Sequence, residues 1–232
     1  MTRKVMIVVT PGLSMRSYAV TEASLAPAAE ESAERRLVDG LRRGEVASFD
    51  RTYADYNERI FSFLLRLSGR RDIAEDLSQE TWLKLAKAAP TLREDTRLGP
   101  LLFTIARNAF VSHRRWSLLD LSRLVTLGFY ATSTGVPGPD EAHERSREVM
   151  VLEMALQALP VASREVLLLI GVEGLEHETA AGILGISYDA LRQRLSRART
   201  QLSEKMAVIE RRGTERTDAT RVRPAPKQGA KS

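Results

Sequence analysis

The segment from Thr179 to Leu195 constrains the fold of this chain more than any other part of the sequence. It combines a small Ala181, where two helices can cross closely, with Gly185 at a turn and Ser187 as a helix-capping residue. The apolar residues that this pattern places on the inner side are Leu184, Ile186 and Leu191. We therefore expect a helix-turn-helix in the C-terminal part of the chain.

The second helix of such a motif is expected to lie in the major groove of DNA, where its side chains reach base edges and phosphates. The candidate DNA-binding residues are Ser187, Tyr188, Asp189, Arg192, Gln193, Arg194 and Arg197. Basic residues stand at 192, 194, 197, 199, 205, 211 and 212, and the acidic residues between them are Glu204 and Glu210. The alternative interpretation is a solvated basic helix flank without a nucleic-acid partner.

The composition suits helical domains and argues against several kinds of chemistry. The chain has 232 residues, 43% of them hydrophobic and 28% charged, and its net charge of +5 permits a polyanionic partner. Cysteine is absent, which excludes disulfides, thiol nucleophiles and cysteine-ligated zinc and favours a reduced cytoplasm. The histidines at 113, 143 and 177 lie far apart, and no catalytic motif is present. We expect no catalytic residue, no metal, no cofactor and no membrane-spanning segment.

The expected fold class is all-α, with two small helical domains joined by a flexible linker. Apolar residues recur at spacings of three and four from Phe49 to near Gly69, Pro90 ends a second helix, and Pro100 opens a third. The expected parts are a disordered leader at 1–33, a first domain at 34–116, a linker at 117–145, the helix-turn-helix domain at 146–212 and a basic disordered tail at 213–232. An apolar patch at 118–130 exceeds what a tether needs, and could form a short helix on either domain or on a partner.

Two surfaces of the first domain are candidate binding sites. The residues Asp76, Gln79, Glu80 and Leu83 share one side of a helix, and we call them the docking face. Such a face suits a protein partner, and its alternative is an ordinary solvated surface. A second group, the basic helix end, combines cations with a planar ring and suits phosphates and an unpaired base. It consists of Arg107, Asn108, His113, Arg114, Arg115 and Trp116.

The basic helix end has an alternative explanation of its own. Cations are favoured at a helix C-terminus by the helix dipole, and Trp116 would then lie in a core. In this interpretation Arg107, Asn108, Arg114 and Arg115 are still on the exposed side of the helix.

Four motifs, in order and spacing, closely resemble an extracytoplasmic-function (ECF) sigma factor of the sigma-70 family over residues 35–210. They are Asp72-Ile-Ala-Glu-Asp-Leu-Ser-Gln-Glu-Thr-Trp-Leu, Thr104-Ile-Ala-Arg-Asn, Ala158-Leu-Pro with Gly174-Leu, and Arg194-Leu-Ser-Arg-Ala-Arg. The resemblance implies that the docking face binds the clamp helices of core RNA polymerase and that the basic helix end melts and holds the minus-ten promoter element. It implies that a loop near residues 90–99 captures one base, and that the helix-turn-helix reads the minus-thirty-five element. It also implies control by an anti-sigma protein, with polymerase supplying the chemistry.

Two rival functions are considered beside a sigma factor. A plain helix-turn-helix repressor or activator needs no polymerase-docking helix in a first domain. A nucleic-acid enzyme needs clustered carboxylates or metal ligands, which the sequence lacks.

Overall fold

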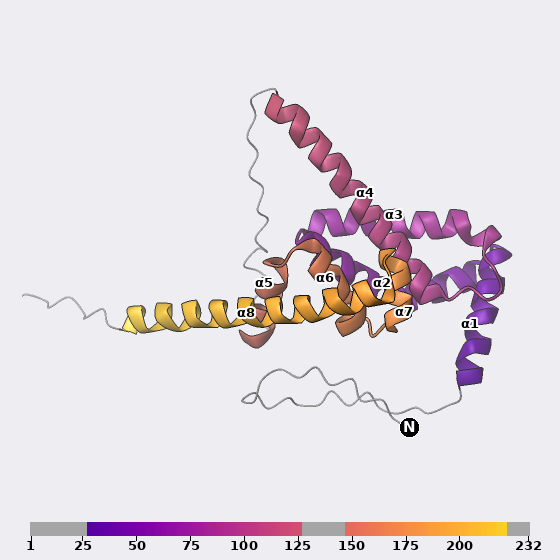
Figure 1. The fold of residues 1–232 in the computed structure, drawn as a ribbon. Helices are drawn as coiled ribbons and strands as arrows, with labels where there is room; N and C mark the ends of the chain where they lie inside the picture. Colours follow the sequence, from indigo (N-terminus) through magenta and orange to yellow (C-terminus); the bar gives the residue numbers. More distant parts are fainter. Residues whose placement is uncertain (1–26, 127–146, 222–232) are drawn as a thin grey trace, which may run out of the picture.

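The computed structural model describes the backbone of residues 27–126 and 147–221, and the side chains from 31–117 and 147–212. All regular elements in these two ranges are helices, which confirms the predicted all-α fold class. The leader at 1–26, most of the linker, at 127–146, and the tail at 222–232 lie outside the described residues. Figure 1 shows a helical body from which the second half of α4 and the distal part of α8 extend.

The first helical unit consists of five elements. These are α1 (Pro27–Arg42), α2 (Val46–Ser68), α3 (Arg71–Ala88), the 3-10 turn η1 (Ala89–Thr91) and α4 (Leu98–Thr126). Helices α2, α3 and α4 pack around a core in which the rings of Phe63 and Phe103 meet edge to face, with centroids 5.3 Å apart. Helix α1 covers one end, where Val38, Leu41 and Leu98 form a smaller buried cluster.

The second unit contains the predicted helix-turn-helix. Its elements are α5 (Arg147–Gln157), α6 (Val161–Leu167), the π-helical turn η3 (Leu168–Val172), α7 (His177–Leu184) and α8 (Tyr188–Arg221). Gly185 ends α7 with a φ of 66°, the left-handed conformation expected for it. The Ser187 hydroxyl accepts a hydrogen bond from the Ala190 amide at 3.2 Å, so the predicted cap of α8 is confirmed.

Helix extends beyond three of the boundaries expected from sequence. Residues 27–33 belong to α1, residues 117–126 to α4 and residues 213–221 to α8, although the sequence assigned them to the leader, the linker and the tail. Pro27 suits the first position of a helix, where its missing N–H is no loss. No proline or glycine interrupts 117–126, and the single Gly213 costs a helix only about 1 kcal/mol. The glycine and proline residues from which these boundaries were predicted either disrupt a helix too weakly or lie too far along the chain to end α1, α4 and α8 there.

The two units pack against each other. Helix α7 contacts α4, and α5 and α6 contact α2. Buried side chains from both units form one continuous apolar cluster, which includes Leu67 and Phe110 from the first unit and Leu159, Val166 and Leu184 from the second. The two helical domains predicted from the sequence are present, and their cores join because each unit leaves apolar side chains on the surface that meets the other.

Candidate nucleic-acid interface

The predicted recognition helix, α8, presents its candidate side chains to solvent at its N-terminal end. Tyr188, Arg192 and Gln193 are exposed, as are Ser187, Asp189 and Arg197, whereas Arg194 is partly buried. The Arg192 guanidinium carbon lies 5.9 Å from the centroid of the Tyr188 ring, which in turn meets the His177 ring edge-on at 6.3 Å. These contacts orient a ring and a cation side by side at the start of α8.

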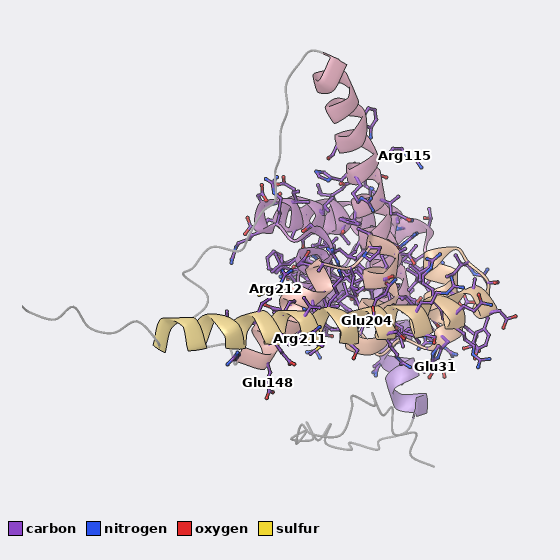
Figure 2. The ribbon with its side chains drawn as sticks, turned by 60° about the vertical axis from the view of Figure 1, so that its left-hand side comes forward. Glu31, Arg115, Glu148, Glu204, Arg211 and Arg212 are labelled. Carbon is purple, nitrogen blue, oxygen red and sulfur yellow. The ribbon has the colours of Figure 1, made fainter. Side chains whose placement is uncertain are left out.

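Positive charge continues along the exposed side of α8. Arg197, Arg199 and Lys205 are exposed, and Arg211 and Arg212 follow further along the helix, where Figure 2 labels them. Leu191, Leu195 and Ala198 are buried on the opposite side against the rest of the unit. The helix is therefore amphipathic, with cations on the side that a DNA backbone can approach.

Arg107 is not on the exposed side of α4, and this part of the prediction is wrong. Its side chain is 19% exposed, and its Nε lies 3.1 Å from Oε1 of Glu165, whose side chain is 5% exposed. Its Nη1 donates to the Ile183 carbonyl oxygen at 3.3 Å. Both partners belong to the second unit, which covers this position because α7 packs against α4. A sequence reading of one amphipathic helix cannot find a partner 58 residues away.

The rest of the basic helix end is accessible. Asn108, Arg114 and Arg115 are exposed and His113 is half-buried, and Figure 2 shows Arg115 where α4 leaves the helical body. Trp116 is 63% exposed. The alternative in which the Trp116 ring lies in a core is therefore excluded, and a flat aromatic surface is available beside cations.

The docking face of α3 is solvent-exposed in large part. Asp76, Gln79 and Leu83 are exposed, and the Leu83 side chain, at 62%, is unusually open for a leucine. Glu80 is partly buried and pairs with Lys84 at 2.6 Å. The buried side of α3 carries Leu77, Thr81 and Leu85, so the helix has one side in the core and one free for a partner.

A surface groove runs beside the docking face, and the sequence reasoning did not identify it. Its lining includes Gln79 and Leu83 together with Tyr53, Phe61 and Trp82. The rings of Tyr53 and Trp82 lie 4.8 Å apart, and Trp82 Nε1 donates to Asn57 Oδ1 at 3.1 Å. The spacing of Tyr53, Asn57 and Phe61 by four residues was the available signal, since it places them on one side of α2.

Two protein families match this chain, each over one helical unit. The family described as Sigma-70 region 2 matches residues 52–116, and the family described as Sigma-70, region 4 matches residues 150–202. The first range contains the docking face and the basic helix end, and the second contains the helix-turn-helix. These two matches, one over each helical unit, define a transcription initiation factor of the sigma-70 class.

Curated relatives narrow this class. The ECF RNA polymerase sigma factor EcfG of Rhodopseudomonas palustris is 35% identical over 145 residues, which are 61% of this chain and 76% of the relative. The RNA polymerase sigma factor CarQ of Myxococcus xanthus is 31% identical over 176 residues, covering 75% of this chain and 97% of the relative. The chain belongs to the ECF RNA polymerase sigma factor family.

Solved structures share the fold. The sigma factor RpoE from Bartonella quintana, crystallised with the anti-sigma factor NepR, matches with a TM-score of 0.61 and 30% identity over 70% of this chain and 99% of that chain. CnrH, solved with the cytosolic domain of CnrY, matches with a TM-score of 0.55 and 22% identity over 76% of this chain and 98% of that one. Within the described ranges, no helix has the length and apolar character needed to cross a lipid bilayer.

Proposed function

We propose that this chain is an alternative sigma factor that docks on core RNA polymerase through α3 and holds one promoter element with each helical unit. The observation that carries the proposal is the exposed docking face with its aromatic groove, on a unit separate from the helix-turn-helix. A plain helix-turn-helix regulator has no need for such a surface. Leu83 at 62% exposure, beside the Tyr53 and Trp82 rings, suits burial by a partner helix.

The second unit is proposed to read the minus-thirty-five element. Tyr188, Arg192 and Gln193 lie exposed at the start of α8, where a recognition helix contacts base edges. Arg197 is exposed further along α8 and is suited to phosphate contact. Such a contact supplies affinity rather than sequence information. The family relationship supports duplex promoter DNA as the partner of this helix.

The first unit is proposed to hold the opened minus-ten element. Asn108, Arg114 and Arg115 supply donors and positive charge along α4, and the exposed Trp116 ring supplies a surface on which an unpaired base can stack. Arg107 belongs to the same group of residues, although its Nε pairs with Glu165 of the second unit in the structure. The loop at residues 90–99 is the proposed site for a captured base.

Regulation by an anti-sigma protein is part of the proposal. The Bartonella quintana relative, at 30% identity, was solved in a complex with such a protein, NepR. A sigma factor works where polymerase and DNA are, so we propose the cytoplasm as its location. The chain itself is proposed to perform no catalysis, because polymerase carries out RNA synthesis.

Transcription in vitro tests the proposed function. The purified chain, added to core polymerase and a library of genomic DNA fragments, is expected to start RNA synthesis from a small set of sites. The double variant Gln79→Ala/Leu83→Ala serves as the negative control, because it lacks the central side chains of the docking face. An absence of initiation from every fragment, with a polymerase that responds to another sigma factor, would contradict the proposal.

A further inference from the structure

The residue that precedes helix α4 cannot cap it. The Leu101 amide donates to the Arg97 carbonyl oxygen at 3.1 Å, which places Arg97 just before the first helical turn. A good capping residue offers a side-chain oxygen to the first amides of the helix, whereas an arginine side chain carries only donors. The amide of Leu98, the first residue of α4, therefore needs an acceptor from elsewhere in the chain.

Glu34 of α1 supplies this acceptor from 64 residues earlier in the chain. Its Oε1 accepts a hydrogen bond from the Leu98 amide at 2.8 Å, and the residue is partly buried. A carboxylate at the N-terminal end of a helix also interacts favourably with the helix dipole. Leu98 is fully buried, so its amide would lose a partner that water cannot easily replace if the acceptor were removed. A side chain of α1 thus stabilises the start of α4.

Apolar packing fixes the loop at residues 90–99 to the same helix. Leu92 and Leu98, towards the two ends of the loop, lie in one buried cluster with apolar side chains of α1. Between these two anchors the chain makes a turn, in which the Thr96 amide donates to the Arg93 carbonyl oxygen at 3.1 Å. Both ends of the loop therefore rest on α1.

Ion pairs restrain the outer side of the loop more weakly. The Arg93 guanidinium donates to both carboxylate oxygens of Asp95, at 3.0 and 3.1 Å, and Arg42 of α1 pairs with Glu94 at 3.3 Å. The Glu94 side chain is 81% exposed, so its pair with Arg42 is a surface contact of small value. The apolar anchors and Glu34 therefore provide most of the hold of α1 on the loop.

We propose that Glu34 is a positioning residue for base capture, which holds the loop at residues 90–99 in the shape that receives an unpaired base without touching DNA itself. The inference rests on the proposed role of this loop in the minus-ten site. A loop that already has its binding shape loses less conformational freedom when a base enters, so more of the contact energy appears as affinity. Glu34 lies outside residues 52–116, which match Sigma-70 region 2, so the family match does not include it.

Hydrogen exchange at the Leu98 amide, followed by NMR on the full chain, tests the capping contact. Glu34→Ala keeps a strong helix former in α1 and removes the acceptor, so we expect this amide to exchange roughly tenfold faster or more. Glu34→Gln retains an oxygen acceptor and should restore most of the protection. The Leu64 amide, in the buried part of α2, should exchange equally in all three proteins if the unit stays folded. Unchanged exchange at Leu98 in Glu34→Ala would overturn the proposal.

Base capture is tested with holoenzyme assembled from the full chain and core polymerase. The probes are fluorescein-labelled single strands that carry the minus-ten strand of a promoter found by transcription in vitro, with an abasic nucleotide at each position in turn. Losing a bound base is expected to weaken binding roughly tenfold, which we call the abasic penalty. Trp116→Ala identifies the position whose penalty comes from stacking on that ring, because this penalty disappears in the variant.

Glu34→Ala is expected to lower the abasic penalty at one other position to roughly two- to threefold, because fewer molecules hold the loop in its binding shape. The penalty that depends on Trp116 should not change, and Glu34→Gln should keep both. Equal penalties in Glu34→Ala and the unchanged chain, or a uniform decrease at every position, would overturn the role of Glu34 while base capture stands. If Trp116→Ala leaves no penalty at any position, the loop captures no base, and its proposed role fails together with this inference.

Glu31→Ala is the matched control for Glu34→Ala. It removes the same charge from α1 at an exposed position that Figure 2 labels, where the Glu31 carboxylate pairs with Arg35 at 2.6 Å. We expect the exchange of the Leu98 amide and every abasic penalty to equal those of the unchanged chain. The same losses in Glu31→Ala as in Glu34→Ala would assign them to the charge of α1 and would overturn the positioning role.

Discussion

The carboxylate of Glu173 lies 3.0 Å from Nε of Arg59, 114 residues earlier in the chain. The Glu173 side chain is only 5% exposed, whereas Arg59 is 44% exposed and lies with its guanidinium carbon 5.6 Å from the centroid of the Phe103 ring. An acidic group of the second unit is thus buried against a partly solvated cation of the first. This asymmetry decides how the pair responds to substitution and to pH.

Burial raises the pKa of Glu173 above its ordinary value of 4.5, and the charge and hydrogen bond of Arg59 oppose this only in part. Because the pKa of Glu173 is raised in the folded chain, the protonated carboxyl group stabilises the fold. This contribution to stability is fully present below pH 4.5 and is lost as the pH rises through the raised pKa. Glu173→Gln mimics the protonated group and removes this loss. We expect the variant to gain stability relative to the unchanged chain as the pH rises from below 4.5 to neutrality. Urea unfolding at several pH values measures the difference, and a difference independent of pH would contradict it.

Arg59→Ala is expected to act in the opposite direction. It leaves the Glu173 carboxylate buried without its cation, which should raise the pKa of Glu173 further and destabilise the folded chain at neutral pH. We expect a loss of about 1 to 2 kcal/mol, less than for a fully buried pair because Arg59 is partly solvated. Urea unfolding measures the loss, and combining Arg59→Ala with Glu173→Gln should recover most of it. If the changes in the free energy of unfolding caused by the two substitutions simply add in the double variant, the two side chains do not interact.

Arg192→Ala and Arg197→Ala are each expected to weaken binding of promoter duplex in a salt-dependent manner. Each arginine that contacts a phosphate displaces a counterion, so losing one should lower the slope of log affinity against log salt by roughly one. Arg36→Ala removes the same charge at an exposed position of α1, outside the helix-turn-helix unit, and serves as the control. Fluorescence anisotropy at several salt concentrations measures the slopes. Unchanged affinity at every concentration would remove Arg192 and Arg197 from the interface.

The double variant Gln79→Ala/Leu83→Ala is expected to reduce capture of core polymerase without unfolding the chain, because both side chains are exposed. Leu83 should contribute more, since burying a leucine side chain is worth roughly 1.5 to 3 kcal/mol. Val46→Ala truncates another exposed apolar residue, 73% exposed, at the start of α2 and is the matched control. Co-purification with tagged core enzyme measures capture, with circular dichroism to check the fold. Normal co-purification of the double variant would refute the assignment of the docking face.

Trp116→Ala is expected to weaken binding of single-stranded DNA while leaving duplex binding by α8 unchanged. Stacking of a base on an aromatic ring is worth about 1 to 3 kcal/mol, so the affinity should fall roughly tenfold or more. The chain has two tryptophans, and Trp82 is buried at 7% exposure, so quenching by added DNA should come from Trp116. Tryptophan fluorescence therefore reports the contact. Equal quenching in the variant and the unchanged chain would exclude stacking at this position.

Features that depend on neighbouring residues were predictable from the sequence. Gly185 and Ser187 determine the turn and the start of α8 through the left-handed backbone of one and the hydroxyl cap of the other, and the structure confirms both. The exposed character of Asp76, Gln79 and Leu83 follows from helical periodicity in the same way. The resemblance to ECF sigma factors, carried by four local motifs, led to the family that the comparisons show.

Features that depend on distant residues were not predictable. Arg107 looked like an exposed cation because nothing near it in sequence suggested Glu165 as a partner. Helix ends at Thr126 and Arg221 were also missed, because a helix continues until a breaker is strong enough to stop it. The exposure of Trp116 was left open between a core and a surface position, and the path of α4 out of the helical body decided it.

The amino-acid sequence by itself determined the all-α fold class, the helix-turn-helix and the class of protein, since these follow from periodicity, capping and short motifs. The tertiary structure alone decided which charges are free and which are paired between the two units. Arg107, Arg164 and Arg59 are similar residues in the sequence, yet the structure places them against a carboxylate, a helix end and a buried glutamate. The physical reason is that burial and ion pairing depend on the distance between groups in space, and packing brings together residues such as Arg59 and Glu173, which are 114 positions apart.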